Sequence, residues 1–252
     1  MARRDSRRKP QPTLTRSAVP TPGGRSSGRN AAGDRELVTL QRRILLRWFR
    51  AGGRRAFPWR RKVGSYQYFV AEMLLQRTRA ESVVPVFDRL IRQAPNLSSL
   101  ARLPRRTLAR GLFELGLPKR ADRLRESARL LMKHHGGRVP RSAAQLRQLP
   151  GVGPYTSDAI AVFAWNQPIA LLDWTTQRVV TRLVGHPASA RPVADLASRR
   201  VVKLLRGRSD PRIFNWALID LAATYCQPRP KCLECPLLDV CRTGRDLTRK
   251  RE

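Results

Sequence analysis

The sequence predicts an all-α protein, and two observations support that prediction. From about residue 34 onward, apolar residues recur at the three- and four-residue spacing that places them on one face of a helix. Strand-like alternation of apolar and polar residues is almost absent, and no repeat of fixed period is visible. With 252 residues, the chain is long enough to bury a substantial core in one large or two small domains.

The predicted helices follow one another from residue 34 to residue 226. Asp34 is placed to cap the first helix, whose apolar stripe includes Leu37 and Trp48, and the sequence AGG at 51–53 ends it. The later helical patterns cover residues 66–78, 81–93, 97–103, 105–115, 119–137, 142–149, 154–165, 174–185, 194–205 and 213–226.

The charge of the chain favours a polyanionic partner. With 51 Lys and Arg residues against 18 Asp and Glu residues, the formal net charge is +33. Arginine greatly outnumbers lysine, and its planar guanidinium suits bidentate contact with phosphate. Nucleic acid is therefore the leading prediction, with a solvated basic surface or an anionic membrane surface as the alternatives.

No segment predicts a membrane span or a secretory signal. No apolar run approaches the ~18 residues that a transmembrane helix needs, and no hydrophobic stretch follows the paired arginines near the N-terminus. An organelle transit peptide is an alternative for this Arg- and Ser-containing leader, but its prolines argue against the amphipathic helix such a peptide forms. We expect a cytoplasmic protein, associated with the nucleoid if the host is bacterial.

Composition divides the chain into four parts. Residues 1–33 are rich in Arg, Pro, Gly and Ser, which predicts a disordered basic tail that attracts DNA without sequence preference. Residues 34–225 form the predicted helical domain. The cysteine segment covers residues 226–242, and a basic C-terminal tail is expected at 243–252.

The sequence LPGVG at 149–153 joins two helical patterns and predicts a helix-hairpin-helix. Gly151 and Gly153 allow positive φ and close approach of the backbone to another molecule, while Pro154 suits the first position of the next helix. Free N–H groups at that helix start form an anion site, for which a DNA phosphate is the expected occupant. The alternative is an ordinary corner between helices, in which glycine serves the turn geometry alone.

The four cysteines follow the spacing C-x5-C-x2-C-x5-C, at Cys226, Cys232, Cys235 and Cys241. Their clustering favours a metal site in a reducing compartment over a disulfide framework. Thiolates at this density can hold an iron–sulfur cluster. Structural zinc is the competing prediction, although zinc sites built from four cysteines usually show two CxxC pairs and this segment has one.

Five motifs in a fixed order resemble the helix-hairpin-helix DNA glycosylase superfamily, the group that includes endonuclease III and adenine DNA glycosylase. They are FPWR at 57–60, AEMLLQRT at 71–78, LPGVGPYTS at 149–157, LLDW at 171–174 and the cysteine segment. The resemblance covers about residues 36–242. It implies a two-lobed all-α fold with a C-terminal iron–sulfur cluster loop, and a monomer that acts on double-stranded DNA containing a mismatched or damaged base.

Two carboxylates are assigned to catalysis. Breaking an N-glycosidic bond develops oxocarbenium character on the sugar, which a nearby carboxylate can stabilise while it orients water. Asp173 matches the catalytic aspartate of the superfamily, and its position also predicts an N-cap. Glu72 interrupts the apolar run FVAEMLL, where burial raises a carboxyl pKa and favours general-acid chemistry. It matches the glutamate that protonates the departing base in adenine glycosylases; a structural carboxylate bonded to the backbone is the alternative.

Tyr155 occupies the position at which bifunctional relatives have a lysine that attacks the sugar and forms a Schiff base. A phenol cannot form that imine, so the sequence predicts a monofunctional enzyme without a coupled lyase step. We expect Tyr155 to line the base pocket or to touch the sugar. The alternative is a tyrosine that only packs on its helix.

The resemblance also assigns the DNA contacts. Gln76 matches the glutamine wedge that fills the gap left by a flipped base, and Leu117 matches the second wedge position. Because flipping costs a few kcal/mol and least at a mismatch, such wedges help to select weakened pairs. The remaining DNA-binding residues belong to the hairpin and the start of the next helix: Gly151, Val152, Gly153 and Thr156.

The implied cofactor is a [4Fe–4S] cluster on the four cysteines, with a structural and DNA-docking role. The first cysteine gap has five residues here, where the family typically has six. For the substrate, the segments ELGLPKRA and LLDWTT favour thymine or uracil opposite guanine, and so does the end of the chain soon after the cysteines. Glu72 and FPWR fit adenine glycosylases, so adenine opposite guanine or 8-oxoguanine is the alternative. A non-catalytic DNA-binding protein and a redox or regulatory iron–sulfur protein are further alternatives.

Overall fold

The protein is helical throughout the residues that its structure, a computed structural model, describes. These are residues 30–249 apart from 55, 117–118, 185–201 and 204–205. Within them there is no β-strand, which confirms the predicted fold class. The helices are α1 (Asn30–Gly52), α2 (Ser65–Leu75), α3 (Ala80–Gln93), α4 (Leu97–Arg102), α5 (Arg105–Leu112), α6 (Lys119–His135), α7 (Ala143–Leu146), α8 (Pro154–Trp165), α9 (Trp174–Val184), α11 (Pro211–Thr224) and α12 (Arg242–Arg249).

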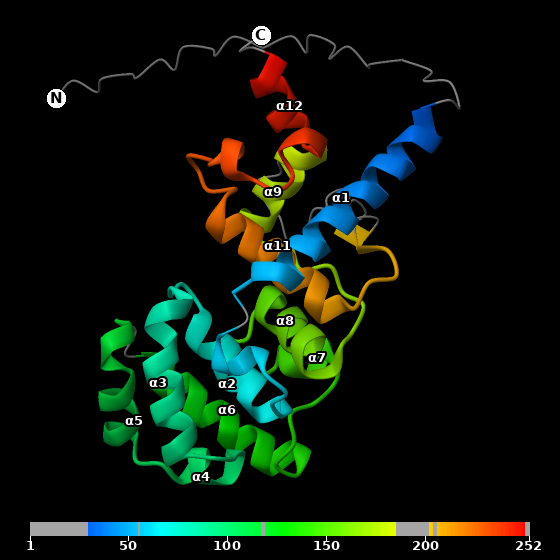
Figure 1. Cartoon of the computed structure of the whole chain (residues 1–252). Helices are drawn as coiled ribbons and strands as arrows, with labels where there is room; N and C mark the ends of the chain where they lie inside the picture. Colours follow the sequence, from blue (N-terminus) through cyan, green and yellow to red (C-terminus); the bar gives the residue numbers. More distant parts are fainter. Residues whose placement is uncertain (1–29, 55, 117–118, 185–201, 204–205, 250–252) are drawn as a thin grey trace, which may run out of the picture.

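The helices form two lobes that share α2 and α8. Helices α3 to α6 gather with α2 in the lower part of Figure 1, whereas α1, α9, α11 and α12 occupy the upper part. We call these the first and the second lobe. Each lobe has its own hydrophobic core, and α8 supplies side chains to both: Ile160 to the first core and Phe163 to the second.

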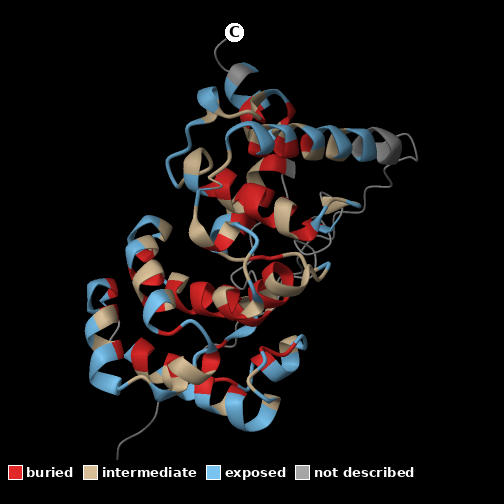
Figure 2. Cartoon of the chain, turned by 60° about the horizontal axis from the view of Figure 1, so that its bottom comes forward, coloured by how far each residue is buried: buried red, intermediate tan, exposed pale blue. Residues whose placement is uncertain are grey.

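Helices α2 and α8 are apolar around most of their circumference because both of their faces are covered. In α2, Phe69, Val70, Met73 and Leu74 are fully or almost fully buried. A helix that is hydrophobic all round belongs in the interior of a protein. Figure 2 shows this distribution, with the buried residues concentrated where the helices face one another and the exposed residues on their outer sides.

Local signals explain where the central helices begin and end. Helix α11 starts after Asp210, whose side chain accepts a hydrogen bond from the Ile213 N–H at 3.1 Å. Helix α8 starts at Pro154, which fits the first helical position, and ends at Trp165, with Asn166 as a C-cap in the left-handed conformation. Helix α1 ends at Gly52, inside the predicted stop at 51–53.

The structure differs from the sequence predictions at both ends of the chain. Helix α1 begins at Asn30, before the predicted cap at Asp34. Helix α12 covers most of the segment expected to be a basic tail, because it packs beside α9 and the Thr243 hydroxyl donates to the Arg182 carbonyl at 3.1 Å. Most of the expected tail at 1–33 and of the helix predicted at 194–205 lies outside the described residues.

In the part of the chain that the structure describes, no helix has both the length and the apolar character needed to cross a bilayer.

Candidate active site

A cavity of about 750 Å³ opens between the two lobes, and it brings together five of the residues that the sequence assigned to function. We call it the interlobe cavity. Its volume is in the range of small-molecule sites in proteins. Helices α2, α8, α9 and α11 all contribute to its lining. The five predicted residues on its wall are Glu72, Gln76, Tyr155, Thr156 and Asp173.

Glu72 is a buried carboxyl group that forms no hydrogen bond with another described residue. It lies on α2 among fully buried apolar side chains and is 8% exposed, yet no hydrogen bond to its side chain is found within the described residues. Burial raises the pKa of Glu72 to about 8, and the nearby positive charge of Arg60 offsets part of that rise. The group is therefore mostly protonated at neutral pH. The alternative of a carboxylate bonded to the backbone does not describe this side chain.

Asp173 lies directly before α9 and is both an N-cap and a cavity residue. Its Oδ1 accepts hydrogen bonds from the backbone N–H of Thr175 at 3.0 Å and of Thr176 at 2.8 Å. The hydroxyls of the same two threonines also donate to Oδ1, at 2.7 and 2.9 Å. Among the described residues no hydrogen bond reaches Oδ2. One oxygen thus fixes the side chain, which leaves the other for a ligand.

Tyr155, in the first turn of α8, lines the same cavity as the two acids. Burial raises the pKa of Tyr155 well above its ordinary value, and the negative charges of Asp173 and Glu72 raise it further. The side chain lines the interlobe cavity and packs against the core of the second lobe. Tyr155 is therefore a neutral phenol at physiological pH, and it is too weak a nucleophile to replace an amine.

The hairpin between α7 and α8 is joined to α2 through Gln76. The Gln76 amide donates to the Gly151 carbonyl at 2.9 Å and to the Thr156 hydroxyl at 3.2 Å. Gly151 has φ +80, a backbone conformation that favours glycine, and a Cβ there would also require the Arg123 side chain to move. The hairpin and the cavity wall are therefore one connected unit.

Three residues assigned to DNA contact are placed differently from the rest. Gly153 has φ −84, so it does not use the positive φ that the sequence predicted, although open space surrounds it. Val152 is 5% exposed and its N–H donates to the Leu149 carbonyl at 3.1 Å, so it anchors the hairpin and does not face a ligand. Leu117 lies outside the described residues.

Two stacked aromatic pairs line the interlobe cavity, and the sequence reasoning did not find them. Phe57 stacks on Trp59 with ring centroids 5.1 Å apart, and Phe163 stacks on Trp216 at 5.3 Å. Phe163 and Trp216 lie 53 positions apart in the sequence, so no local pattern predicts that they pair. Aromatic walls of this kind suit a flat, partly apolar ligand.

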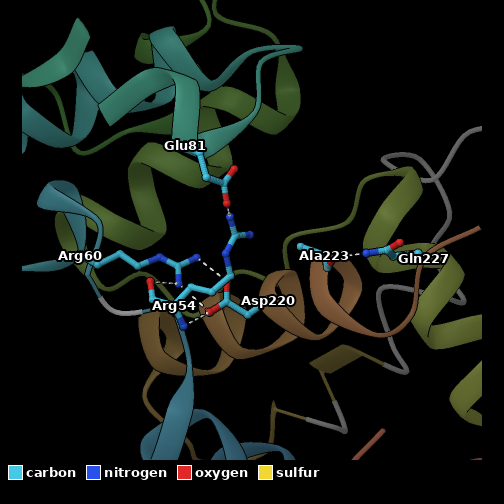
Figure 3. A network of polar contacts seen from close by, with 6 residues as sticks. All are labelled: Arg54, Arg60, Glu81, Asp220, Ala223 and Gln227. Carbon is cyan, nitrogen blue, oxygen red and sulfur yellow. Dashed lines mark hydrogen bonds and ion pairs between the residues drawn. The ribbon is translucent and has the colours of Figure 1, made fainter. Parts of the chain in front are cut away.

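An ion-pair network ties the segment between α1 and α2 to both lobes (Figure 3). The Arg60 guanidinium donates to both carboxylate oxygens of Asp220 on α11, at 2.7 and 2.8 Å, and Asp220 is fully buried. The Arg54 N–H donates to the same carboxylate at 2.8 Å, while its guanidinium pairs with Glu81 at the start of α3. Because a buried ion pair is costly to break, this network fixes one wall of the cavity.

The four cysteines lie as neighbours in one loop, and none forms a disulfide. Burial raises the pKa of Cys235 to about 11, and the other three thiols add to that rise. In the described residues no three Cys, His, Asp or Glu side chains are arranged to hold a metal ion. A four-iron cluster takes one thiolate on each iron, so its ligands stand farther apart than those of a single ion. The four cysteine thiols of this loop are the number and kind of ligand that such a cluster needs.

Helix α9 connects Asp173 to the cysteine loop. Arg178 donates through Nε to the Cys226 carbonyl at 2.8 Å, and Arg182 donates to the Pro228 carbonyl at 3.0 Å. At the far end of the loop, the Cys241 thiol contacts the Arg182 carbonyl at 3.1 Å. The helix that begins beside the catalytic candidate therefore also fixes both ends of the loop.

A two-lobed helical chain with a glycine hairpin beside an acid-lined cavity defines the helix-hairpin-helix glycosylase fold. The family described as HhH-GPD superfamily base excision DNA repair protein matches residues 70–212, and the chain belongs to this superfamily.

Individual relatives support the same assignment. A thymine-DNA glycosylase of Aeropyrum pernix is 34% identical over an alignment of 218 positions, which covers 82% of this chain and 96% of the relative. An adenine DNA glycosylase of Mycolicibacterium smegmatis is 37% identical over 195 residues, 77% of this chain and 66% of the relative. The solved structure of a thermostable thymine-DNA glycosylase superposes with a TM-score of 0.77 at 30% identity, covering 85% of this chain and 99% of the other. An endonuclease III–DNA complex shares the fold, with a TM-score of 0.71 at 21% identity and coverage of 85% and 98%.

Proposed function

We propose that the protein is a monofunctional DNA glycosylase that flips a mispaired base into the interlobe cavity and hydrolyses its N-glycosidic bond. The preferred substrate is thymine or uracil opposite guanine. The observation that supports this most strongly is the pairing of two acids in one cavity. Glu72 is buried, protonated and without a described partner, while Asp173 is held through one oxygen only.

The two acids divide the reaction between them. Glu72, with a pKa near 8, donates its proton to the departing base, which leaves as a neutral molecule. The Asp173 carboxylate stabilises the positive charge that develops on the sugar, while water attacks the anomeric carbon and releases a proton to the solvent. The aromatic pairs that line the cavity stack on the flat face of the flipped base. This division follows the general rule that environment sets opposite roles for two carboxyl groups.

Tyr155 supports the monofunctional assignment. A lyase step needs an amine that forms a Schiff base with the sugar, and a phenol with a raised pKa has neither the nitrogen nor the nucleophilicity. The product is then an intact strand with an abasic site.

The preference for thymine or uracil rests on the relatives as well as on the sequence. A thymine-DNA glycosylase of A. pernix and a thymine/uracil-DNA glycosylase of Methanothermobacter thermautotrophicus are 34% and 33% identical to this chain. Adenine glycosylase activity is the second candidate, because the adenine DNA glycosylase of M. smegmatis has the slightly higher identity.

A panel of duplexes tests the proposal. We expect the purified protein to release free base from T·G or U·G duplexes faster than from A·G or A·8-oxoguanine duplexes, and to leave strands that break only after alkali treatment. Strands broken before alkali would contradict the monofunctional assignment. Faster release of adenine would favour the second candidate, and binding without any release would leave only a DNA-binding protein.

We further propose that Cys226, Cys232, Cys235 and Cys241 hold a [4Fe–4S] cluster. The cluster would serve as a structural and DNA-docking group that cross-links the loop, while the chemistry at the base stays with the acids. Protein purified without oxygen should contain about four irons per chain. A Cys235→Ala variant should lose iron and the visible absorbance together. Zinc in a 1:1 ratio would contradict this cofactor assignment and leave the glycosylase proposal standing.

A further inference from the structure

Trp174 is the one tryptophan that the fold leaves exposed. It is the first residue of α9, and 63% of its surface is accessible. All five tryptophans of the chain lie within the described residues. Among those residues, the Trp174 indole has no ring partner, no arginine over its face and no hydrogen bond. Each of the other four packs against an aromatic ring or an arginine: Trp48, Trp59, Trp165 and Trp216.

The position of Trp174 distinguishes it from other exposed apolar residues. Single exposed hydrophobic side chains are common on soluble proteins and need no explanation by themselves. Trp174, however, lies between Asp173 and Thr175, both of which line the interlobe cavity. The main-chain N–H of Thr175 is fixed to Asp173, so the first turn of α9 is rigid. Trp174 is therefore flanked by two lining residues on a firmly capped helix turn, and its own indole is exposed outside the cavity lining.

Basic residues lie on α9 and in the cysteine loop, the elements that follow Trp174, although the loop also exposes Glu234 and Asp239. Arg178, one turn later on the same face of α9, also lines the cavity and bonds to the cysteine loop. That loop presents Arg229 and Lys231 to solvent, along with two exposed prolines. An aromatic ring beside cationic side chains is the arrangement with which proteins stack on bases while they track a phosphate backbone.

We propose that the Trp174 indole stacks on the DNA at the rim of the interlobe cavity, against a nucleotide adjacent to the flipped one. This inference rests on the proposed function, since it requires a flipped nucleotide to enter the cavity. Trp174 then supports the strand beside the gap left by the flipped nucleotide, a gap that the resemblance assigns to Gln76, and so helps to present the sugar to Asp173. Stacking tolerates any base, so the contact adds affinity for the distorted duplex without reading its sequence.

Three variants test this role in the full-length protein. The probe is a duplex with a tetrahydrofuran abasic-site analogue opposite guanine, which cannot be cleaved, and the reference is the matching undamaged duplex. Trp174→Ala should weaken binding to the abasic duplex by about 10- to 100-fold, and Trp174→Phe should restore most of it because a phenyl ring still stacks. Leu40→Ala, which truncates a 42% exposed side chain on α1, is the control and should bind as the wild type does.

Tryptophan fluorescence supplies a second readout that a purely structural residue would not move. The exposed indole should account for most of the quenching when the abasic duplex binds, so Trp174→Phe should lose that quenching while it keeps its affinity. The melting temperature of each variant should match the wild type, because the side chain is 63% exposed and has no ring partner, arginine partner or hydrogen bond among the described residues.

The outcomes separate this inference from the proposed function. Wild-type protein that neither releases a base nor prefers the abasic duplex contradicts the proposed function itself. Suppose that the wild type releases a base and prefers the abasic duplex, but Trp174→Ala keeps its affinity and Trp174→Phe keeps full quenching. Only the proposed role of Trp174 is then overturned. Equal loss of affinity in the Ala and Phe variants overturns stacking, because the ring would then not be the group that matters.

Discussion

Asp173→Asn is expected to reduce base release by about a thousandfold while DNA binding persists. The amide keeps the size of the side chain and remains a good N-cap, so the hydrogen bonds to Thr175 and Thr176 can be retained. What is lost is the negative charge that stabilises the developing oxocarbenium ion. Loss of one such electrostatic contact costs about a thousandfold in rate. Single-turnover release of base from a T·G duplex, with affinity measured in parallel, checks the result.

Asp246→Asn is the matched control for this experiment. Asp246 is an exposed aspartate on α12, outside the residues that line the interlobe cavity. Its amide variant should release base at the wild-type rate. Undiminished base release by Asp173→Asn would contradict a catalytic role for Asp173, even though the residue lines the cavity.

Glu72→Gln is expected to reduce base release by about 10²- to 10⁴-fold, the usual contribution of a positioned general acid. Glutamine has nearly the same shape but no proton to give. In the wild type, release should fall as the pH rises through about 8, because Glu72 then loses its proton. The Gln variant should lack that fall. Glu126→Gln, a change at an exposed position on α6, is the control and should retain the wild-type pH profile.

The same substitution should also raise stability, which separates a catalytic loss from a folding defect. The pKa of Glu72 is raised in the native state, so between pH 4.5 and about 8 the unfolded chain gives up a proton that the native protein keeps. The free energy of unfolding of the wild type therefore falls as the pH rises through this window. Glu72→Gln avoids that loss, and its advantage in melting temperature should grow from pH 4.5 to 8. A variant that is less stable than the wild type at pH 8 would contradict the raised pKa of Glu72.

Much of the fold could be predicted because its signals are local. Helical periodicity, the glycines at 51–53 and the LPGVG turn each act within a few residues, and each predicted element in the described ranges appears as a helix or a turn. Helix α12 was missed because its own sequence is too polar to predict burial. It is stabilised by contacts with α9, which only the tertiary structure supplies.

The site could be predicted only in part, for a similar reason. Glu72, Tyr155 and Asp173 belong to recognisable motifs, and the structure brings them to one cavity. The Arg60–Asp220 pair and the stacked Phe163–Trp216 pair join segments that are distant in the sequence, so no spacing rule finds them. For Val152, the motif indicated a hairpin contact but could not reveal that the side chain points into the core.

The most direct test of the account compares two uncleavable duplexes that differ in one charge. One contains a cationic pyrrolidine ring in place of the deoxyribose opposite guanine, and the other contains the neutral tetrahydrofuran ring. A site complementary to the oxocarbenium ion binds the cation more tightly. We predict that the wild type prefers the cationic duplex and that Asp173→Asn loses this preference while it still binds the neutral one. Equal affinity of the wild type for both duplexes, or an unchanged preference in the variant, would contradict a catalytic carboxylate at position 173.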